Sequence, residues 1–147
     1  MIIYLCDIDG TIADLSHRLH FIQRDKPDWN AFFRACVDDL PIQEVIDTVR
    51  LLSEGGAEIL LLSGRSELVR FETLQWLQKF NVPCDALFMR EEGDHRQDNI
   101  VKGEFLDDLF EKWEKNDIRG AFEDRKQVVD MYRARGLRVF QVAEGNF

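Results

Sequence analysis

The sequence predicts an α/β fold, a doubly wound, five-stranded parallel sheet with a small helical cap insertion. Five short apolar runs of strand length are separated by segments whose apolar residues recur at helical spacing. This alternation is typical of parallel sheets joined by right-handed crossovers. No linker, internal repeat or low-complexity stretch interrupts residues 1–147, so we expect a single domain.

The first strand is expected within residues 1–6, an apolar run that stops at two carboxylates, Asp7 and Asp9. Ligands of open α/β sheets bind at the carboxyl ends of the strands, so both acids are expected at the functional edge. Two carboxylates this close repel each other unless a cation or a shared proton relieves them. Gly10 permits a sharp turn, and Thr11 offers a hydroxyl and an N–H group. These residues suit a metal-bound phosphoryl group; the alternative is a pair of acids that only cap a solvated turn.

Residues 15–40 are expected to form the cap insertion, beside the exit of the first strand. Asp28 is a good N-cap for a helix over residues 29–36. The aromatic residues of this helix are Trp29, Phe32 and Phe33. Aromatic residues at helical spacing usually belong to the core, and we expect this of all three; stacking on a nucleobase is the alternative.

Four further strands and four further helices complete the predicted fold. The strands are expected over residues 58–62, 86–89, 118–122 and 137–142. The helices are expected from Pro41 to Gly55-Gly56, over residues 67–80, after Asp98, and from about Val128 to Arg135. On the helix over residues 67–80, the side chains expected on the apolar face are Leu68, Phe71, Leu74 and Leu77. The sheet is thus expected to be Rossmann-like.

The chain is acidic, since 19 Lys and Arg residues against 28 Asp and Glu residues give a net charge of −9. Such a chain lacks the general electrostatic footprint of proteins that bind long nucleic-acid tracts or membrane surfaces, although a few local cations can hold one phosphate end. No apolar stretch reaches transmembrane length and no signal peptide is evident. We therefore expect no membrane association and a cytoplasmic location.

Cysteine and histidine residues show no recognisable metal-binding pattern. The cysteines are Cys6, Cys36 and Cys84. Their odd number and apolar neighbours predict small core residues in a reducing compartment, with a catalytic thiol as the alternative. His17 and His20 have i, i+3 spacing that would suit two metal ligands, but the sequence supplies no remaining ligands for them.

Polar residues also follow two later strands directly. Ser63-Gly64-Arg65 follows residues 58–62, and Glu123-Asp124-Arg125 follows residues 118–122. In a parallel sheet these residues gather at the same edge as the first acid pair. Taken singly, each set can be explained as a turn or a solvated helix end, and Lys102 as a surface lysine. Together they supply the carboxylates, hydroxyl and lysine that phosphate-ester cleavage requires.

The order of these residues resembles the four motifs of the haloacid dehalogenase (HAD) superfamily of phosphohydrolases. The matching residues are Asp7-Ile8-Asp9-Gly10-Thr11, Ser63, Lys102 and Asp124. Further matches resemble the 3′-phosphatase domain of phage-type polynucleotide kinase-phosphatase. They are Leu62-Ser63-Gly64-Arg65, Met89-Arg90, Asp98, Phe122-Glu123-Asp124-Arg125, and Arg18, eleven residues after Asp7. The resemblance covers nearly the whole chain.

The resemblance implies a role for each of these residues. It implies catalytic roles for Asp7, Asp9, Ser63 and Lys102, substrate contacts for Thr11, Arg18, Gly64, Arg65 and Asp98, and Mg²⁺ ligands from Asp7, Asp9 and Asp124. Asp7 would attack phosphorus and form an aspartyl-phosphate, while Asp9 would protonate the leaving hydroxyl and then activate water. Lys102 would also offset the charge on Asp7. The two arginines would hold the substrate phosphate, and Asp98 would orient one of these cations.

The chain departs from the family pattern in two ways. Glu123-Asp124 stands where paired aspartates are common, so we expect Asp124 to be the metal ligand and Glu123 to support it. The sequence also contains no G-x-x-x-x-G-K-[ST] motif, so no 5′-kinase activity is expected in this chain. A separate kinase or ligase partner would have to supply such a step.

The predicted function is Mg²⁺-dependent removal of a 3′-phosphate, or a 2′,3′-cyclic phosphate, from DNA or RNA ends. The short cap favours a polymer end, whereas the net charge of −9 favours the first alternative, a small-molecule HAD phosphatase for nucleotides or sugar phosphates. A receiver-type signalling domain is disfavoured because Met89-Arg90 stands where its acceptor aspartate should end the third strand. A catalytically inactive HAD-like module is disfavoured because every motif residue is present. The choice between DNA and RNA, and the oligomeric state, stay open.

Overall fold

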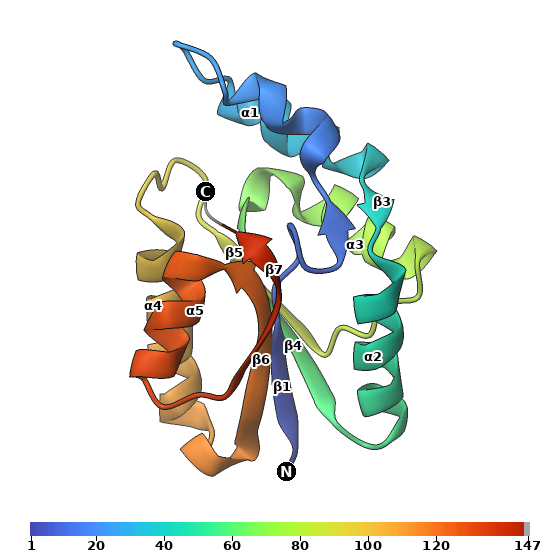
Figure 1. The fold of residues 1–147 in the computed structure, drawn as a ribbon, viewed down its shortest axis with the longest axis vertical. Coiled ribbons are helices and arrows are strands. Elements are labelled where there is room, and N and C mark those ends of the chain that lie inside the picture. The colour runs from blue at the N-terminus through green and yellow to red at the C-terminus, as the bar shows by residue number, and fades with distance from the viewer. Residues whose placement is uncertain (146–147) are drawn as a thin grey trace.

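The computed structural model describes residues 1–145, which build a five-stranded parallel sheet with helices on both faces (Figure 1). The strands are β1 (Ile3–Cys6), β4 (Glu58–Ser66), β5 (Ala86–Arg90), β6 (Ile118–Arg125) and β7 (Val139–Gly145). They lie in the order β5-β4-β1-β6-β7, and every neighbouring pair is parallel. The predicted α/β fold class is confirmed.

The helices cover the sheet in two layers. They are α2 (Gln43–Glu54), α3 (Arg70–Lys79), α4 (Asp98–Lys112) and α5 (Lys126–Ala134). Helices α2 and α3 bury aliphatic and aromatic side chains on one face, including Ile46 and Trp76. Helices α4 and α5 bury Leu106, Val129 and Tyr132 on the other. Because both faces of the sheet are covered, its central strands are apolar on both sides, and this is why they form continuous hydrophobic runs in the sequence.

The cap insertion lies over the carboxyl ends of the strands (Figure 1). A two-stranded antiparallel ladder of β2 (Ala13–Asp14) and β3 (Leu40–Pro41) frames it. Between these strands come the 3₁₀ helix η1 (Ser16–Phe21), helix α1 (Trp29–Arg34) and the 3₁₀ helix η2 (Ala35–Asp38). The carboxylate of Asp28 accepts a hydrogen bond from the backbone N–H of Ala31 at 3.0 Å, which confirms the predicted N-cap.

Several predicted boundaries are shifted. Pro41 pairs with Ala13 in the short ladder, so α2 begins at Gln43 and not at Pro41. Strands β4 and β6 continue beyond their apolar runs because their backbones resume pairing after a register shift, at Ser66 and Arg125. A 3₁₀ turn, η3 (Glu67–Val69), precedes α3, and another, η4 (Lys115–Asp117), precedes β6. The polar residues that follow the apolar runs of β4 and β6 are therefore part of these strands, although the hydrophobic pattern predicts that the strands end before them.

The apolar face predicted for this helical region is correct for Leu68 and Leu77 but wrong for Phe71 and Leu74. Phe71 is 67% exposed and Leu74 is 43% exposed, whereas Thr73, Trp76 and Leu77 are buried. Residues spaced by three advance by only 300° around a helix of 3.6 residues per turn, so a strict three-residue stripe drifts off any one face. The true buried face therefore includes Trp76, which the stripe omits.

The three cysteines lie in or near the core, as their apolar neighbours predict. Cys6 and Cys36 are buried, Cys84 is half-buried, and all three thiols are free. Burial raises the pKa of each thiol above its ordinary value, which keeps it protonated and poorly nucleophilic. None of the helices within residues 1–145 has the length and hydropathy needed to cross a bilayer.

Candidate active site

A cavity of about 300 Å³ opens between the cap and the carboxyl ends of the strands. The predicted site residues that line it are Asp7, Asp9, Gly64, Asp98, Lys102 and Asp124. Other predicted residues are fully buried outside this lining, namely Thr11, Arg18, Ser63 and Arg65. Strands β1, β4 and β6 thus bring together residues that are far apart in the sequence, as a parallel sheet requires.

Asp7 lies at the base of the cavity and is 6% exposed. The ammonium group of Lys102 donates to its Oδ1 atom at 2.7 Å and to Glu123 Oε2 at 2.8 Å. The hydroxyl of Thr11 donates to Asp7 Oδ2 at 3.0 Å and lies 3.3 Å from Asp124 Oδ1. Burial by itself would lower the pKa of Lys102, but the charges of Asp7 and Glu123 outweigh it and raise the pKa well above its ordinary value. Lys102 is therefore a permanent cation beside Asp7.

Asp7, Glu123 and Asp124 form a compact carboxylate cluster, in which one oxygen from each residue lies within 4.8 Å of the others. Burial, followed by the charge of Asp7, raises the pKa of Asp124 to about 7 and the pKa of Glu123 well above its ordinary value. Three carboxylates beside one ammonium group are short of positive charge. This all-oxygen donor set suits a hard divalent cation such as Mg²⁺.

Glu123 is already engaged on both oxygens. Its Oε2 atom accepts from Lys102, and its Oε1 atom accepts from the backbone N–H groups of Asp124 and Arg125 at 3.2 and 3.1 Å. Asp7 also accepts hydrogen bonds on both oxygens, from Lys102 and from Thr11, so these contacts do not separate Asp7 from Glu123 as a metal ligand. The assignment of Asp124 as a metal ligand, with Glu123 in a supporting role, stays a prediction.

Two glycines leave space for carboxylates of this site. Gly10 has a φ of +82°, and a Cβ atom there would overlap the carboxylate of Asp124. A Cβ atom on Gly64 would overlap the carboxylate of Asp98, and the backbone carbonyl of Gly64 accepts from Arg90 Nε at 2.8 Å. In both places a side chain of any size would displace an acidic residue of the site.

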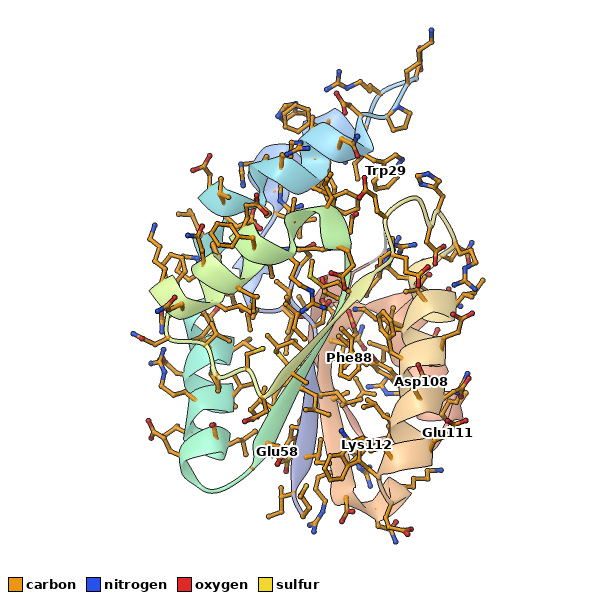
Figure 2. The ribbon with its side chains drawn as sticks, turned by 180° about the vertical axis from the view of Figure 1, so that it is seen from behind. Trp29, Glu58, Phe88, Asp108, Glu111 and Lys112 are labelled. Carbon is orange, nitrogen blue, oxygen red and sulfur yellow. The ribbon has the colours of Figure 1, made fainter. Side chains whose placement is uncertain are left out.

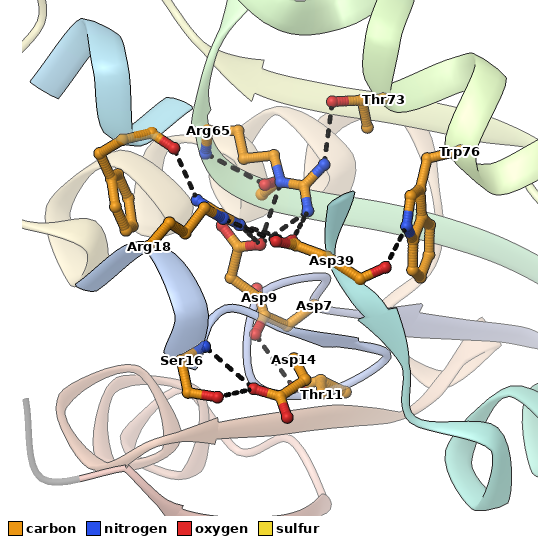
Figure 3. Close-up of polar contacts among 12 residues, drawn as sticks. Asp7, Asp9, Thr11, Asp14, Ser16, Arg18, Asp39, Arg65, Thr73 and Trp76 are labelled. Atoms are coloured by element: carbon orange, nitrogen blue, oxygen red, sulfur yellow. Dashed lines mark hydrogen bonds and ion pairs between the residues drawn. The ribbon is translucent and has the colours of Figure 1, made fainter. Parts of the chain in front are cut away.

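A second buried charge cluster lies under the cap, where Arg18 and Arg65 converge on Asp9 and Asp39 (Figure 3). Asp9 Oδ1 accepts from Arg18 Nη2 at 2.6 Å and from Arg65 Nη2 at 2.8 Å. Asp39 Oδ2 accepts from the same two nitrogens at 2.7 and 3.0 Å. Burial would raise the pKa of Asp9, but the two guanidinium groups outweigh it and lower the pKa to about 2. Asp9 is thus held as a carboxylate.

Both arginines are fully buried and contact Asp9, so in this arrangement they position the second acid of the motif. Their contact with a substrate phosphate stays a prediction. Ser63 is also fully buried, and its hydroxyl oxygen accepts from the backbone N–H of Arg65 at 3.0 Å. This bond ties Ser63 to the turn that carries the arginine.

The predicted contact between Asp98 and one of the arginines Arg18 and Arg65 is wrong. Asp98 pairs with Arg90, and its Oδ2 atom accepts from Arg125 Nη1 at 2.7 Å. Asp98 is the first residue of α4, and its two arginine partners are the last residues of β5 and β6. Both arginine partners of Asp98 line the cavity, whereas the two arginines under the cap do not. Of these four arginines, Arg90 and Arg125 are therefore the two that face the substrate space.

Sequence reasoning missed Asp39, which is 2% exposed. It accepts from both buried arginines, lies 2.7 Å from His17 Nε2, and its backbone carbonyl accepts from Trp76 Nε1. Buried arginines require carboxylate partners, so burial of Arg18 and Arg65 would have indicated a further acidic residue near them. This indication could not distinguish Asp39 from its neighbour Asp38, which is exposed.

Comparison with known proteins agrees with this geometry. The family described as "Polynucleotide kinase PNKP phosphatase domain" matches residues 2–147. A protein of Autographa californica nuclear polyhedrosis virus, named "Putative bifunctional polynucleotide kinase/RNA ligase", is 29% identical over 131 residues, which are 88% of this chain and 17% of the viral protein. The chain therefore spans less than a fifth of that relative.

Solved structures show the same relationship. A chain of the "Pnkp1/Rnl/Hen1 complex" is 34% identical with a TM-score of 0.79, covering 98% of this chain and 46% of that chain. A chain of the "Pnkp1/Rnl/Hen1 RNA repair complex" is 33% identical with a TM-score of 0.80, covering 98% and 43%. A class C acid phosphatase from Bacillus anthracis, 14% identical with a TM-score of 0.72 over 99% of this chain and 67% of that one, shares the fold. From these matches and the assembled motif residues, the chain belongs to the family of polynucleotide kinase PNKP phosphatase domains, within the HAD phosphatases.

Proposed function

We propose that this chain is an Mg²⁺-dependent phosphomonoesterase that removes the 3′-phosphate from DNA or RNA ends, with 2′,3′-cyclic phosphate ends as further substrates. The observation that carries the proposal is the buried pair of Asp7 and Lys102 at the base of a cavity, with Nζ and Oδ1 2.7 Å apart. Membership of the PNKP phosphatase family supports a nucleic-acid end as the substrate. The domain would span residues 1–147 and carry the cap within it.

In the first step, a carboxylate oxygen of Asp7 attacks phosphorus and the bond from phosphorus to the 3′-oxygen breaks. Lys102 holds Asp7 in place through their ion pair and stabilises the charge on the phosphoryl oxygens. Thr11 holds the second oxygen of Asp7 and so fixes the direction of attack. The 3′-oxygen leaves with a proton from Asp9, and the two arginines favour this transfer because they stabilise the carboxylate that remains. The product is an aspartyl-phosphate on Asp7.

In the second step, water attacks the phosphorus of the aspartyl-phosphate. Asp9, which Arg18 and Arg65 hold as a carboxylate, accepts the proton of that water. The bond from phosphorus to Asp7 breaks, inorganic phosphate is released, and Asp9 carries the proton that the next cycle uses. Protons and phosphate therefore balance over one turnover.

Mg²⁺ would be held by the carboxylates of Asp7 and Asp124 and by the backbone carbonyl of Asp9. The charge shortage of the carboxylate cluster supports this assignment. Bound there, the cation supplies electrostatic stabilisation of the phosphoryl oxygens. Gly64, which lines the cavity at the end of β4, would approach the same oxygens with its backbone. Ser63, Arg65 and Arg18 are buried behind the lining and would hold this strand end and Asp9 in position.

The kinase step is proposed to lie outside this chain, on a separate kinase or ligase partner. The sequence has no P-loop motif, and two related chains were solved as parts of Pnkp1/Rnl/Hen1 assemblies. A cytoplasmic location is supported by three free thiols, since a reducing compartment preserves them.

The test is Mg²⁺-dependent phosphate release from a 3′-phosphorylated oligonucleotide, compared with a 3′-mononucleotide, a 5′-mononucleotide and a sugar phosphate. We expect the oligonucleotide to have the highest kcat/KM, EDTA to abolish release, and Asp7→Asn to be inactive. The matched control is Asp108→Asn, which removes an exposed carboxylate from α4 and should retain activity. Acid quenching with a radiolabelled substrate should trap a phosphorylated protein in the wild type.

If mononucleotides or sugar phosphates are preferred by a wide margin, the polymer-end function is wrong and a small-molecule phosphatase replaces it. Activity that survives in Asp7→Asn would instead contradict the catalytic assignment.

A further inference from the structure

One wall of the catalytic cavity is apolar and comes entirely from the cap. The cap residues that form it are Leu15, Leu19, Ile22, Trp29, Phe32 and Phe33, and the cap also contributes the polar residue Asn30 to the lining. We propose that this cap wall, with Trp29 at its exposed end, stacks on the base of the terminal nucleoside whose 3′-phosphate reaches Asp7. The inference rests on the proposed function and adds to it the group that selects a nucleoside over other phosphate esters.

Trp29 is the ring of the wall that is free to accept a base. It is 44% exposed, whereas Phe32 is 6% exposed and Phe33 is half-buried. The core position expected for Trp29 from its helical spacing is therefore wrong, because the side chain lies at the cavity and not under the cap. Figure 2 shows Trp29 on α1, on the side of the cap that faces the loop between β5 and α4.

The ring of Trp29 is held in place by its neighbours. It packs edge-on against Phe32, with centroids 5.8 Å apart and planes at 89°, and lies 6.1 Å from Phe33. The guanidinium of Arg18 lies 4.5 Å from the centroid of Phe32 and so anchors that ring. Phe33 packs against the small core cluster that contains Cys36. A ring braced in this way loses little entropy when a base stacks on it.

The rest of the cavity has the complementary chemistry. Opposite the cap lie charged and polar residues of the loop between β5 and α4, including His95, Arg96 and Gln97, and the floor holds Asp7 and Lys102. A cavity of about 300 Å³ is at the lower limit for a drug-sized ligand, so the wall and the floor can be reached together by one nucleotide. The floor suits the phosphate and the cap wall suits the flat apolar face of the base.

This division of chemistry disfavours a sugar phosphate. A sugar without a base presents hydroxyl groups, which lose hydrogen bonds to water without compensation against six apolar side chains. A nucleobase gains stacking energy there, and the gain is tolerant of sequence because every base has a flat face. The wall therefore explains recognition of a terminal nucleoside in a chain whose net charge of −9 disfavours general binding to phosphates.

The experiment compares two 3′-phosphorylated oligonucleotides that differ only at the terminal nucleoside, which carries either a base or an abasic residue. Initial rates are measured with the wild type, Trp29→Ala, Trp29→Phe and the control Phe71→Ala, which removes an exposed aromatic ring outside the cavity. For the wild type, we expect the abasic end to raise KM about tenfold, which corresponds to about 1.4 kcal/mol. Trp29→Ala should lose this preference, Trp29→Phe should keep most of it, and Phe71→Ala should keep all of it.

A loss of equal size on both substrates in Trp29→Ala would show that Trp29 only supports the cap, and the stacking proposal would be overturned. If the wild type releases no phosphate from either oligonucleotide but is active on a sugar phosphate, the proposed function itself fails. The two failures are thus distinguishable.

A binding measurement makes the result independent of turnover. Asp7→Asn is titrated with a thymidine 3′-phosphate, and tryptophan fluorescence is recorded in this variant and in Asp7→Asn/Trp29→Phe. Trp76 is buried, and Trp113 packs against the core cluster under α4 and α5, so quenching by the base should disappear with Trp29. Quenching that persists unchanged in the double variant, or that is absent from both, contradicts the proposal.

Discussion

At the scale of single residues, the site consists of two buried charge clusters that share one motif. Asp7 belongs to the cluster with Lys102, and Asp9 belongs to the cluster with Arg18 and Arg65. These acids are two residues apart in the sequence, but their electrostatic surroundings are opposite. Asp7 has one ammonium group and two further carboxylates beside it, whereas Asp9 has two guanidinium groups and one further carboxylate. Neighbouring carboxylates with different environments are suited to different chemical roles.

Gly10 provides a residue-scale prediction about the first cluster. Gly10→Ala should lower kcat/KM about 100-fold or more, because its Cβ atom would displace the carboxylate of Asp124 and disturb the geometry around Asp7. The measurement is phosphate release with the 3′-phosphorylated oligonucleotide.

The matched control is Gly56→Ala, where φ is +101° and no atom lies within 4 Å of a new Cβ atom. Both substitutions introduce about 1–2 kcal/mol of left-handed backbone strain, so only the contact with Asp124 differs. Equal activity losses in the two variants would mean that strain, and not displacement of Asp124, is responsible.

Asp39 provides the prediction for the second cluster. Asp39→Asn should destabilise the folded protein by about 3–5 kcal/mol, because two fully buried arginines would then have only Asp9 as a charged partner. Urea unfolding followed by circular dichroism measures this change.

Asp38→Asn is the control, since it makes the same chemical change at an exposed neighbour and should stay within about 0.5 kcal/mol of the wild type. A small effect at Asp39 as well would show that the arginines are adequately neutralised by Asp9 alone.

At the scale of elements, the strands carry the functional residues further than their hydrophobic runs extend. In β4 and β6, pairing resumes after a register shift at Ser66↔Arg90 and Arg125↔Gly145. Hydrophobic patterns record side-chain burial, whereas a ladder is held by backbone hydrogen bonds, so polar residues can continue a strand without a local signal. Arg90 and Arg125, which face the cavity, are held at these extended strand ends.

Helix α3 provides an element-scale prediction, because its buried face differs from the one that its spacing suggests. Leu77→Ala should lower the free energy of unfolding by about 2–5 kcal/mol, since Leu77 is 2% exposed. Phe71→Ala should change it by no more than about 0.5 kcal/mol, since Phe71 is 67% exposed.

Both variants are compared by urea denaturation, with the same dependence of the unfolding free energy on urea concentration used for each. A large loss for Phe71→Ala would restore the original stripe as the packing face of this helix.

At the scale of the whole molecule, the carboxylate cluster joins β1 to β6, so a cation bound there stabilises the folded chain. Mg²⁺ should raise the thermal midpoint, because a ligand that binds only the folded state contributes about 2.7 kcal/mol when its concentration is 100 times Kd. For a chain of 147 residues we expect a shift of several degrees, measured by differential scanning fluorimetry.

Asp124→Asn should remove this shift, and a NaCl series at matched ionic strength excludes general screening. An equal Mg²⁺ shift in wild type and Asp124→Asn would place the stabilising cation elsewhere.

Local spacing was enough to predict the α/β class and the strands that the polar residues follow, and the resemblance to the HAD motifs supplied the candidate site residues. Which charges meet depends on the tertiary structure. It pairs Asp39 with Arg18 and Arg65, Asp98 with Arg90 and Arg125, and it places Trp29 at the cavity. These contacts join residues that are distant in the chain, and several chemically equivalent carboxylates compete for each arginine. Which carboxylate pairs with which arginine depends on how the helices and strands pack, and the local sequence pattern carries no information about that packing.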